Sequence, residues 1–171
     1  MKVIFLDFDG VLNSQGSFVY EDNRRKKHKE QGVKGPVNET LCNVCTANFQ
    51  ALLDQYPDVK VVLSTTWRNL YTMDWLKEKL ESYHISSNRV IDKTPVIGLG
   101  EERGLEIKTW LDAHPEVTQY IVLDDNDWGI ADLHANQFVQ TEWYDGLTFT
   151  KAELAGWKLS TAYRNMLKKA P

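Results

Sequence analysis

Two pairs of carboxylates in this sequence each follow directly on an apolar run of strand-forming residues. Asp7 and Asp9 follow the first such run, and Asp124 and Asp125 follow the last strong one. Acids at the tip of a buried strand are costly unless a cation lies among them. Oxygen ligands of this kind suit a hard divalent cation, so the pattern predicts a metal site, most simply for Mg²⁺. The alternative is an ordinary acidic turn after each strand.

A third group of polar residues follows the apolar run 59–63. Ser64 and Thr65 come first, and Trp67 and Arg68 follow them. The hydroxyls can bind a phosphate at the end of the strand, or they can cap the next helix. Trp67 can stack on a base and Arg68 can contact phosphate. Alternatively, Trp67 packs in the core and Arg68 pairs with a carboxylate.

Arg103 is the candidate cation for binding an anionic substrate. It stands at the start of a predicted helix, and in an α/β sheet the helix N-termini share an edge with the carboxyl ends of the strands. Lys108 lies about a turn and a third further along the helix and would have to reach back. The alternative for Arg103 is a surface residue with no role at the site.

The elements that must position these residues alternate along the chain. Strands are predicted over 2–7, 59–63, 89–91, 119–123 and 137–140, and helices over 38–56, 72–83, 105–113, 130–135 and from a capping box at Thr150 onward. This alternation indicates an α/β fold with a mostly parallel sheet covered by helices on both faces. Ligands bind beyond the carboxyl ends of such strands, so the acids and Ser64 should meet at one edge.

The segment 14–37 is polar and is predicted to form a small insert or flap. Phe18, Val19 and Tyr20 suggest one arm of a hairpin within it. The basic run Arg24–Lys29 is either a solvated face or a cationic arm for a phosphate-rich partner, nucleic acid in particular.

Composition bounds the class of protein. The chain has 171 residues, 42% hydrophobic and 26% charged, which fits a single globular domain over 1–171. A net charge of −4 argues against a surface built wholly for nucleic acid but permits a local basic patch. The sequence shows neither a membrane-spanning run nor a signal peptide, so we expect a cytoplasmic protein without membrane contact.

Cys42 and Cys45 form a C-x-x-C pair within a helical pattern. Such a pair can be a redox couple or half of a zinc site. Because no second Cys or His pair at matching spacing accompanies it, we expect the two side chains to serve as small apolar residues in helix packing.

The motifs DFDGVLN, VVLSTTWR, an arginine-bearing helix start and IVLDDND occur in this order. Together they resemble the four ordered motifs of the haloacid dehalogenase-like (HAD) hydrolase superfamily. The resemblance covers most of the chain and implies a three-layer Rossmann-like core with a small flap and a minimal cap.

The resemblance also implies roles for the acids. Asp7 would be the nucleophile that forms an aspartyl phosphate, and Asp9 would be the general acid and base. Ser64 and Arg103 would bind the phosphoryl group. Mg²⁺ would be held by Asp7, the backbone carbonyl of Asp9, and Asp124 and Asp125.

An acid at position 9 favours a phosphomonoesterase over the dehalogenases and transport ATPases of the superfamily. The short insert implies an open site that suits a large substrate, and Ser64–Arg68 with Arg103-Gly104 is similar to small HAD domains associated with RNA repair. We therefore expect a nucleotide or polynucleotide phosphate as substrate. The alternatives are a phosphoprotein or small-metabolite phosphatase, and a non-catalytic module that binds a metal or a partner.

Overall fold

The computed structural model describes residues 1–30, 40–98 and 102–169. The described strands form a five-stranded sheet in the order β3-β2-β1-β4-β5, and every neighbouring pair is parallel. The strands are β1 Lys2–Leu6, β2 Val59–Leu63, β3 Val90–Lys93, β4 Gln119–Asp124 and β5 Phe138–Gln140. The α-helices are α1 Gln15–Glu30, α2 Asn43–Gln55, α3 Met73–Glu81, α4 Arg103–Asp112, α5 Ile130–His134, α6 Phe149–Lys158 and α7 Thr161–Leu167. The predicted parallel α/β sheet is thereby confirmed.

The register of the sheet brings three polar strand ends to one level. Leu6 of β1 pairs with Leu63 of β2 on one side and with Leu123 of β4 on the other. The residue after each of these leucines is an acid or a serine, so the polar groups continue the same row. Asp7, at the end of the central strand β1, therefore lies between the ends of β2 and β4, as the sequence predicted.

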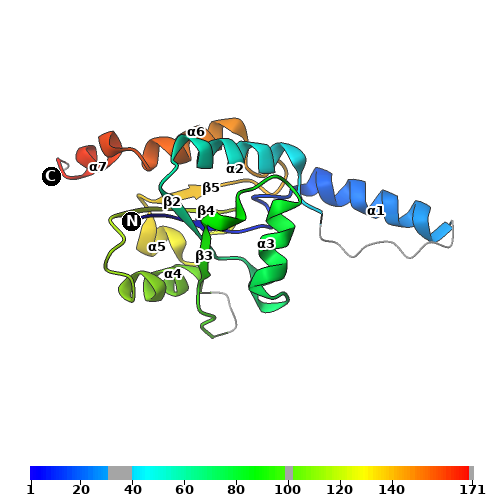
Figure 1. The fold of residues 1–171 in the computed structure, drawn as a ribbon, viewed down its shortest axis with the longest axis horizontal. Helices are drawn as coiled ribbons and strands as arrows, with labels where there is room; N and C mark the ends of the chain where they lie inside the picture. Colours follow the sequence, from blue (N-terminus) through cyan, green and yellow to red (C-terminus); the bar gives the residue numbers. More distant parts are fainter. Residues whose placement is uncertain (31–39, 99–101, 170–171) are drawn as a thin grey trace.

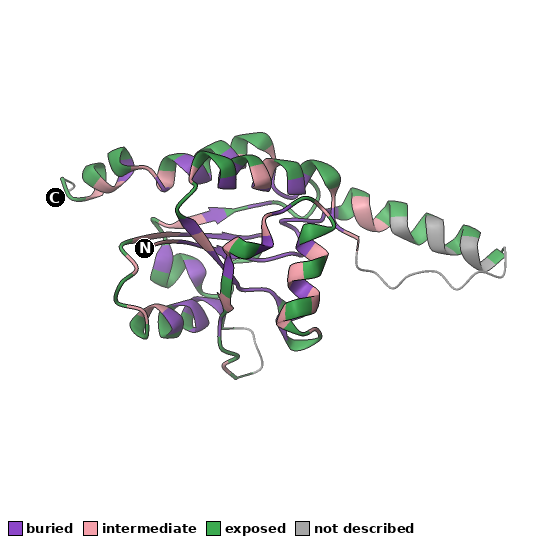
Figure 2. Ribbon diagram, in the orientation of Figure 1, coloured by how far each residue is buried: buried purple, intermediate pink, exposed green. Residues whose placement is uncertain are grey.

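Alternate residues of β1 point into two separate apolar layers. Ile4 and Leu6 belong to a core cluster with residues of α2, α3 and α6, whereas Val3 and Phe5 pack with Ile107 of α4 and other residues of the opposite face. Figures 1 and 2 show α2 and α6 on one side of the sheet, α4 and α5 on the other, and buried strands between them. A parallel sheet covered on both faces accounts for the continuous apolar runs in the sequence.

The predicted hairpin arm around Phe18 is wrong, because Gln15–Glu30 forms the helix α1. Strand pairing would need a partner edge, whereas the charged residues that follow Tyr20 form a helix readily. The helix is anchored at its start: the Gln15 amide donates to Trp143 O (2.9 Å), and the Phe18 and Trp143 rings stack at 4.8 Å. Beyond this anchor α1 extends away from the sheet (Figure 1).

Helix boundaries differ from the predictions at α2 and near the carboxyl end. Cys42 is the N-cap of α2, and the predicted N-cap Asn38 lies outside the described residues. The predicted capping box at Thr150 is wrong: Thr148 caps α6 and accepts from the Lys151 amide. The predicted single terminal helix is divided, since the Ser160 hydroxyl accepts from the Tyr163 amide (3.1 Å) and starts α7.

The remaining predicted helices and short strands are present with ends shifted by a residue or two. Two short 3₁₀ helices, Thr66–Asn69 and Ser87–Arg89, follow β2 and precede β3. In the part of the chain that the structure describes, no helix has the length and apolar character needed to cross a membrane.

Candidate active site

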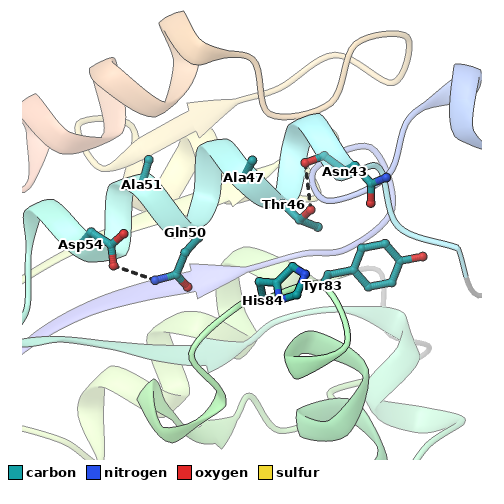
Figure 3. A pocket seen from close by; sticks show the side chains of 8 residues that line it. All are labelled: Asn43, Thr46, Ala47, Gln50, Ala51, Asp54, Tyr83 and His84. Atoms are coloured by element: carbon teal, nitrogen blue, oxygen red, sulfur yellow. Dashed lines mark hydrogen bonds between the residues drawn. The ribbon is translucent and has the colours of Figure 1, made fainter.

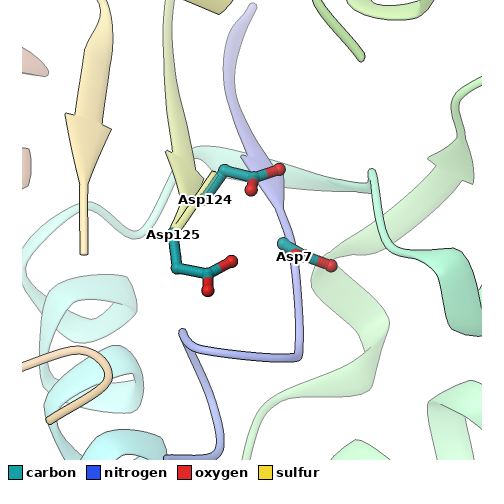
Figure 4. Close-up of side chains that lie close together, drawn as sticks. All are labelled: Asp7, Asp124 and Asp125. Atoms are coloured by element: carbon teal, nitrogen blue, oxygen red, sulfur yellow. The ribbon is translucent and has the colours of Figure 1, made fainter. Parts of the chain in front are cut away.

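Three carboxylates meet at the carboxyl edge of the sheet. One oxygen from each of Asp7, Asp124 and Asp125 lies within 4.8 Å of the others, and Figure 4 shows the three side chains at the ends of neighbouring strands. Asp7 and Asp124 are buried, and Asp125 is partly exposed. Residues more than a hundred positions apart in the sequence thus form one acidic cluster.

The three carboxyl groups of the cluster are costly to ionise, even with Arg103 beside them. Burial raises the pKa of Asp7 to about 6, against the opposing effect of Arg103. Burial and the charge of Asp7 raise the pKa of Asp124 well above its ordinary value, and burial also raises that of Asp125. Asp7 Oδ1 is buried and has no hydrogen-bond partner among the described residues. An all-oxygen donor set with an unpartnered buried oxygen fits Mg²⁺.

Gly10 allows the loop after β1 to approach this cluster. Its φ is +70°, and a Cβ built there would lie 2.3 Å from Asp125 Cγ. Any larger residue would push the two acidic loops apart, so glycine is needed after the second aspartate.

Arg103 is buried at the start of α4 and reaches into the cluster. Its Nη1 lies 3.3 Å from Asp124 Oδ2 and 3.8 Å from Asp7 Oδ1. Lys108, the alternative from the sequence, is exposed and pairs with Asp112 at 2.6 Å. The structure therefore places Arg103, and not Lys108, beside the predicted nucleophile.

Arg68 is buried among protein partners, whereas the sequence left contact with phosphate and pairing with a carboxylate both open. The guanidinium is buried, and Nη2 lies 2.5 Å from Glu106 Oε2. It also donates to the backbone carbonyls of Thr65 (2.5 Å) and Thr94 (3.2 Å). Arg68 thus ties the segment after β2 to α4, which is the carboxylate pairing that the sequence had left open.

Trp67 packs in the core, which is one of the two roles that the sequence left open. Only 6% of the residue is exposed, and its ring packs against Phe8 with centroids 5.3 Å apart. Its Nε1–H donates to Asp9 Oδ2 (2.9 Å), while Asn13 Nδ2 donates to Asp9 Oδ1 (2.8 Å). Each oxygen of Asp9 therefore accepts a hydrogen bond from the protein, and these two bonds fix the orientation of the carboxylate before any ligand binds.

Ser64 and Thr65 have different surroundings although they are neighbours. The Ser64 hydroxyl is buried and has no partner within the described parts of the chain. The Thr65 hydroxyl accepts from the Trp67 amide (3.3 Å) and caps the 3₁₀ helix Thr66–Asn69. Ser64 Oγ thus has no capping role, whereas Thr65 has the capping role that the sequence offered as an alternative.

Sequence reasoning missed two buried residues that organise the site. Asn13 donates to Asp9 and also accepts from the Gly10 amide (2.9 Å). Glu106 lies between two guanidinium groups, 2.5 Å from Arg68 and 3.5 Å from Arg103 Nε. Because residues three apart on a helix are neighbours, the sequence could have predicted the Arg103–Glu106 pair. No pattern in the neighbouring sequence indicated the contact between Glu106 and Arg68.

A groove along α2 shares no residue with the acidic cluster. It lies between α2 and the segment after α3, as Figure 3 shows. Its lining consists of Asn43, Thr46, Ala47, Gln50, Ala51, Asp54, Tyr83 and His84. Because Asp54 is the one acidic residue in this lining, and no Lys or Arg joins it, the groove lacks the set of charged groups that phosphate chemistry would need.

We expect Glu106→Gln to destabilise the protein by about 3–5 kcal/mol, because it leaves the buried Arg68 guanidinium without its carboxylate partner and removes one of the carboxylates around Arg103. Urea unfolding measures the change. The matched control is Asp112→Asn, which breaks the Lys108–Asp112 pair; those side chains are 49% and 65% exposed. The control should cost less than about 1 kcal/mol. Equal effects of the two substitutions would contradict the organising role of Glu106.

The fold and the site define the class of protein: a parallel α/β domain with an aspartate cluster at the carboxyl edge of its sheet. Residues 3–152 match the family described as the HAD domain in Swiss Army Knife RNA repair proteins, and the chain belongs to this family. None of the curated proteins compared with it matches.

Two solved structures resemble the fold, and both are of the HAD domain of effector protein Lem4 from Legionella pneumophila. The inactive mutant is 15% identical with a TM-score of 0.57, covering 97% of this chain and 98% of that chain. The other structure is 17% identical with a TM-score of 0.52, covering 98% of this chain and 94% of that chain. At these identities the likeness concerns the fold.

Proposed function

We propose that the protein is a Mg²⁺-dependent phosphomonoesterase that acts through an aspartyl phosphate on Asp7. The observation that carries the proposal is a pair of buried, unpartnered polar atoms, Asp7 Oδ1 and Ser64 Oγ, at one sheet edge beside Arg103. Buried polar groups are nearly always hydrogen-bonded, and a bound ligand or ion is one explanation for two that are not and that lie at the same sheet edge. A phosphoryl group would satisfy the serine and the arginine while it receives the attack of the carboxylate.

The residues have different roles in the two steps of the reaction. An oxygen of Asp7 attacks phosphorus, and the bond from phosphorus to the ester oxygen breaks. Asp9 gives its proton to the leaving oxygen and later takes a proton from the water that attacks the aspartyl phosphate. Ser64 and Arg103 bind the phosphoryl oxygens during both transfers.

Asp7, Asp124, Asp125 and the backbone carbonyl of Asp9 would hold the metal ion. When bound, Mg²⁺ neutralises the charge that otherwise sets an anionic nucleophile against an anionic substrate. Arg103 supplies part of the same neutralisation, since it already lies within 3.8 Å of Asp7 and 3.3 Å of Asp124.

Mg²⁺ should stabilise the protein more at pH 8 than at pH 5. In the metal-free protein the pKa of Asp7 is about 6 instead of 3.8, so stability falls as the pH rises from about 4 to 6 and the buried acid ionises. The ionised acids bind the metal, so its effect is largest above this window. At ten times the dissociation constant the gain is ~1.4 kcal/mol. Thermal unfolding with and without MgCl₂ measures it, and Asp125→Asn should remove most of the gain. An equal gain at both pH values would contradict the site.

The substrate we favour is a phosphorylated nucleotide or polynucleotide end. The family occurs in RNA repair proteins, and the basic run Arg24–Lys29 lies on α1, which extends from the body of the domain (Figure 1). Of its side chains, those of Lys26 and Lys27 are described, and both are exposed. Lys26 pairs with Asp22 at 2.7 Å with both side chains more than half exposed, so the pair gives way to phosphate at little cost.

With Trp67 buried, Trp128 becomes the aromatic candidate near the site. It is 41% exposed in the loop after β4, and its carbonyl accepts from the Gly104 amide (3.1 Å), next to Arg103. Its φ of 44° is rare for a residue with a side chain, which points to a constrained position. A shallow hollow beside it is lined by Glu102, Leu105, Trp128, Gly129, Asp132 and Leu133.

The test is a substrate panel of 3′- and 5′-phosphorylated oligonucleotides, mononucleotides, sugar phosphates, phosphopeptides and an aryl phosphate. We expect oligonucleotides to give the highest kcat/KM. Replacing the five Lys and Arg residues of Arg24–Lys29 by glutamine should raise KM for oligonucleotides and flatten its salt dependence while leaving the aryl phosphate unaffected. Trp128→Ala should raise the same KM about fivefold to a hundredfold.

Other results of the panel would replace the proposal. Preference for phosphopeptides or for a sugar phosphate would assign a phosphoprotein or metabolite phosphatase with the same site. No turnover of any ester in the presence of Mg²⁺ would leave a non-catalytic metal-binding or partner-binding module.

A further inference from the structure

The pair Cys42 and Cys45 stands at the N-terminus of α2, apart from the acidic cluster. Cys42 is the N-cap, and Cys45 lies three residues later, on the same side of the first turn. Both thiols are free, and they are the two cysteines of the chain. An N-cap side chain and the residue three positions later face each other, which is the arrangement in which two thiols can close a disulfide.

The two sulfur atoms have unequal surroundings. Cys42 is partly exposed, whereas Cys45 is 1% exposed. The Cys45 thiol lowers the pKa of Cys42 to about 5; burial opposes this, and the amides of Cys45 and Val44 and the Ser14 hydroxyl support it. The interaction with Cys42 and burial raise the pKa of Cys45. One thiol is therefore accessible and ready to ionise, and the other is sheltered and protonated.

Cys45 is enclosed by the turn that contains Asp145 and Gly146. Its Sγ lies 3.4 Å from Asp145 O, and a Cβ at Gly146 would lie 2.7 Å from that sulfur. The Cys42 amide donates to Leu12 O (2.8 Å), which fixes the start of the helix. With both backbones fixed and Cys45 enclosed, an external thiol or oxidant meets Cys42 first, and the partner within reach is Cys45.

A zinc site does not account for the pair. Among the described residues, the one group of three or more His, Cys, Asp or Glu side chains that could hold a metal is Asp7, Asp124 and Asp125. The cysteines have no third or fourth ligand there, and zinc takes four.

We propose that Cys42 and Cys45 are a redox-active dithiol that a peroxide converts to an intramolecular disulfide, with Cys42 as the attacking and Cys45 as the resolving thiol. The Cys42 thiolate attacks one oxygen of hydrogen peroxide, breaks the O–O bond and becomes a sulfenic acid as hydroxide leaves and takes a proton. The Cys45 sulfur then forms the S–S bond, its proton and the sulfenic hydroxyl leave as water, and peroxide is reduced to two waters. A dithiol reductant reverses the reaction.

The experiment uses the full chain, reduced and then treated with hydrogen peroxide at a small molar excess, followed by alkylation and intact-mass measurement. We expect a loss of about 2 Da with no alkylation, restored by dithiothreitol. Cys45→Ser should stop at a sulfenic acid on Cys42, about 16 Da heavier and trapped by dimedone. Cys42→Ser should react at least about tenfold more slowly, because the remaining thiol is enclosed and protonated.

A second measurement needs no variant. The rate of alkylation of Cys42 in the reduced wild-type protein should reach half its maximum well below pH ~8.5, the value of a free cysteine. The proposal is overturned by half-maximal alkylation near that free value, by peroxide products without the loss of two hydrogens, or by a disulfide between two chains. Equal oxidation rates of the two serine variants would overturn the assignment of attacking and resolving thiols. None of these outcomes depends on phosphatase activity.

Discussion

Asp7→Asn is expected to lower kcat for an aryl phosphate by about a thousandfold or more, because an amide cannot form the covalent phosphoryl intermediate. The residue lies within the acidic cluster and within 3.8 Å of Arg103, so the loss should appear in kcat with every substrate of the panel. The measurement is steady-state turnover in saturating MgCl₂.

The fold of this variant should remain intact. Replacing a buried carboxylate whose pKa is raised to about 6 removes a cost of ionisation, so the metal-free variant should be at least as stable as the wild type at pH 8. The control is Asp58→Asn, an exposed acid before β2 at the opposite edge of the sheet, which should leave kcat unchanged. Residual activity within tenfold of wild type, with the fold intact, would remove Asp7 as nucleophile.

Asp9→Asn is expected to cost about 10²–10⁴-fold with an alkyl phosphate, because the leaving alcohol then departs without a proton. With p-nitrophenyl phosphate the first step should be nearly unaffected, since that leaving group is a weak base. Hydrolysis of the aspartyl phosphate on Asp7 should still be slow, because the variant lacks the carboxylate that takes a proton from the attacking water. A rapid burst of one p-nitrophenolate per protein molecule should therefore precede a slow steady state, and stopped-flow absorbance measures it.

Equal losses with both leaving groups, and no burst, would contradict the acid and base role of Asp9. A loss confined to KM would instead indicate that Asp9 contributes only to binding.

Trp67→Phe tests the orientation of Asp9 without touching its chemistry. Phenylalanine retains an aromatic ring against Phe8 but removes the N–H that donates to Asp9 Oδ2. We expect about a tenfold loss in kcat with the alkyl phosphate, because a hydrogen bond to a charged group contributes about 1.5–3 kcal/mol and part of it orients the acid. The loss should be smaller with the aryl phosphate. Trp110→Phe is the matched control: it removes a donor to Asp92 (2.6 Å) far along α4, and kcat should not change.

Much of the fold could be read from local patterns. The mainly apolar runs at 59–63 and 119–123 predicted β2 and β4 within a residue, because a strand covered on both faces is largely apolar. The alternation of strands and helices then implied a parallel sheet whose strand ends share an edge. The meeting of Asp7, Asp124 and Asp125 follows from that geometry alone.

The elements without such patterns were predicted poorly. The segment Gln15–Glu30 has few apolar residues and no clear period, so neither hairpin nor helix could be recognised from it. The division between α6 and α7 depends on whether Ser160 turns its hydroxyl to the next amide, which a helical apolar pattern does not record.

The sequence by itself determined which acids stand at strand ends, the order of the motifs and the parallel sheet that gathers them. Only the tertiary structure decided what the residues around them do. The Trp67 ring N–H donates a hydrogen bond to Asp9, 58 residues away in the sequence, and Arg68 pairs with Glu106, 38 residues away. From the sequence alone, the Trp67 and Arg68 side chains could have faced either a substrate or the core. Their orientation depends on partners that come close only when β1, β2 and α4 pack together, and local propensity carries no information about such contacts.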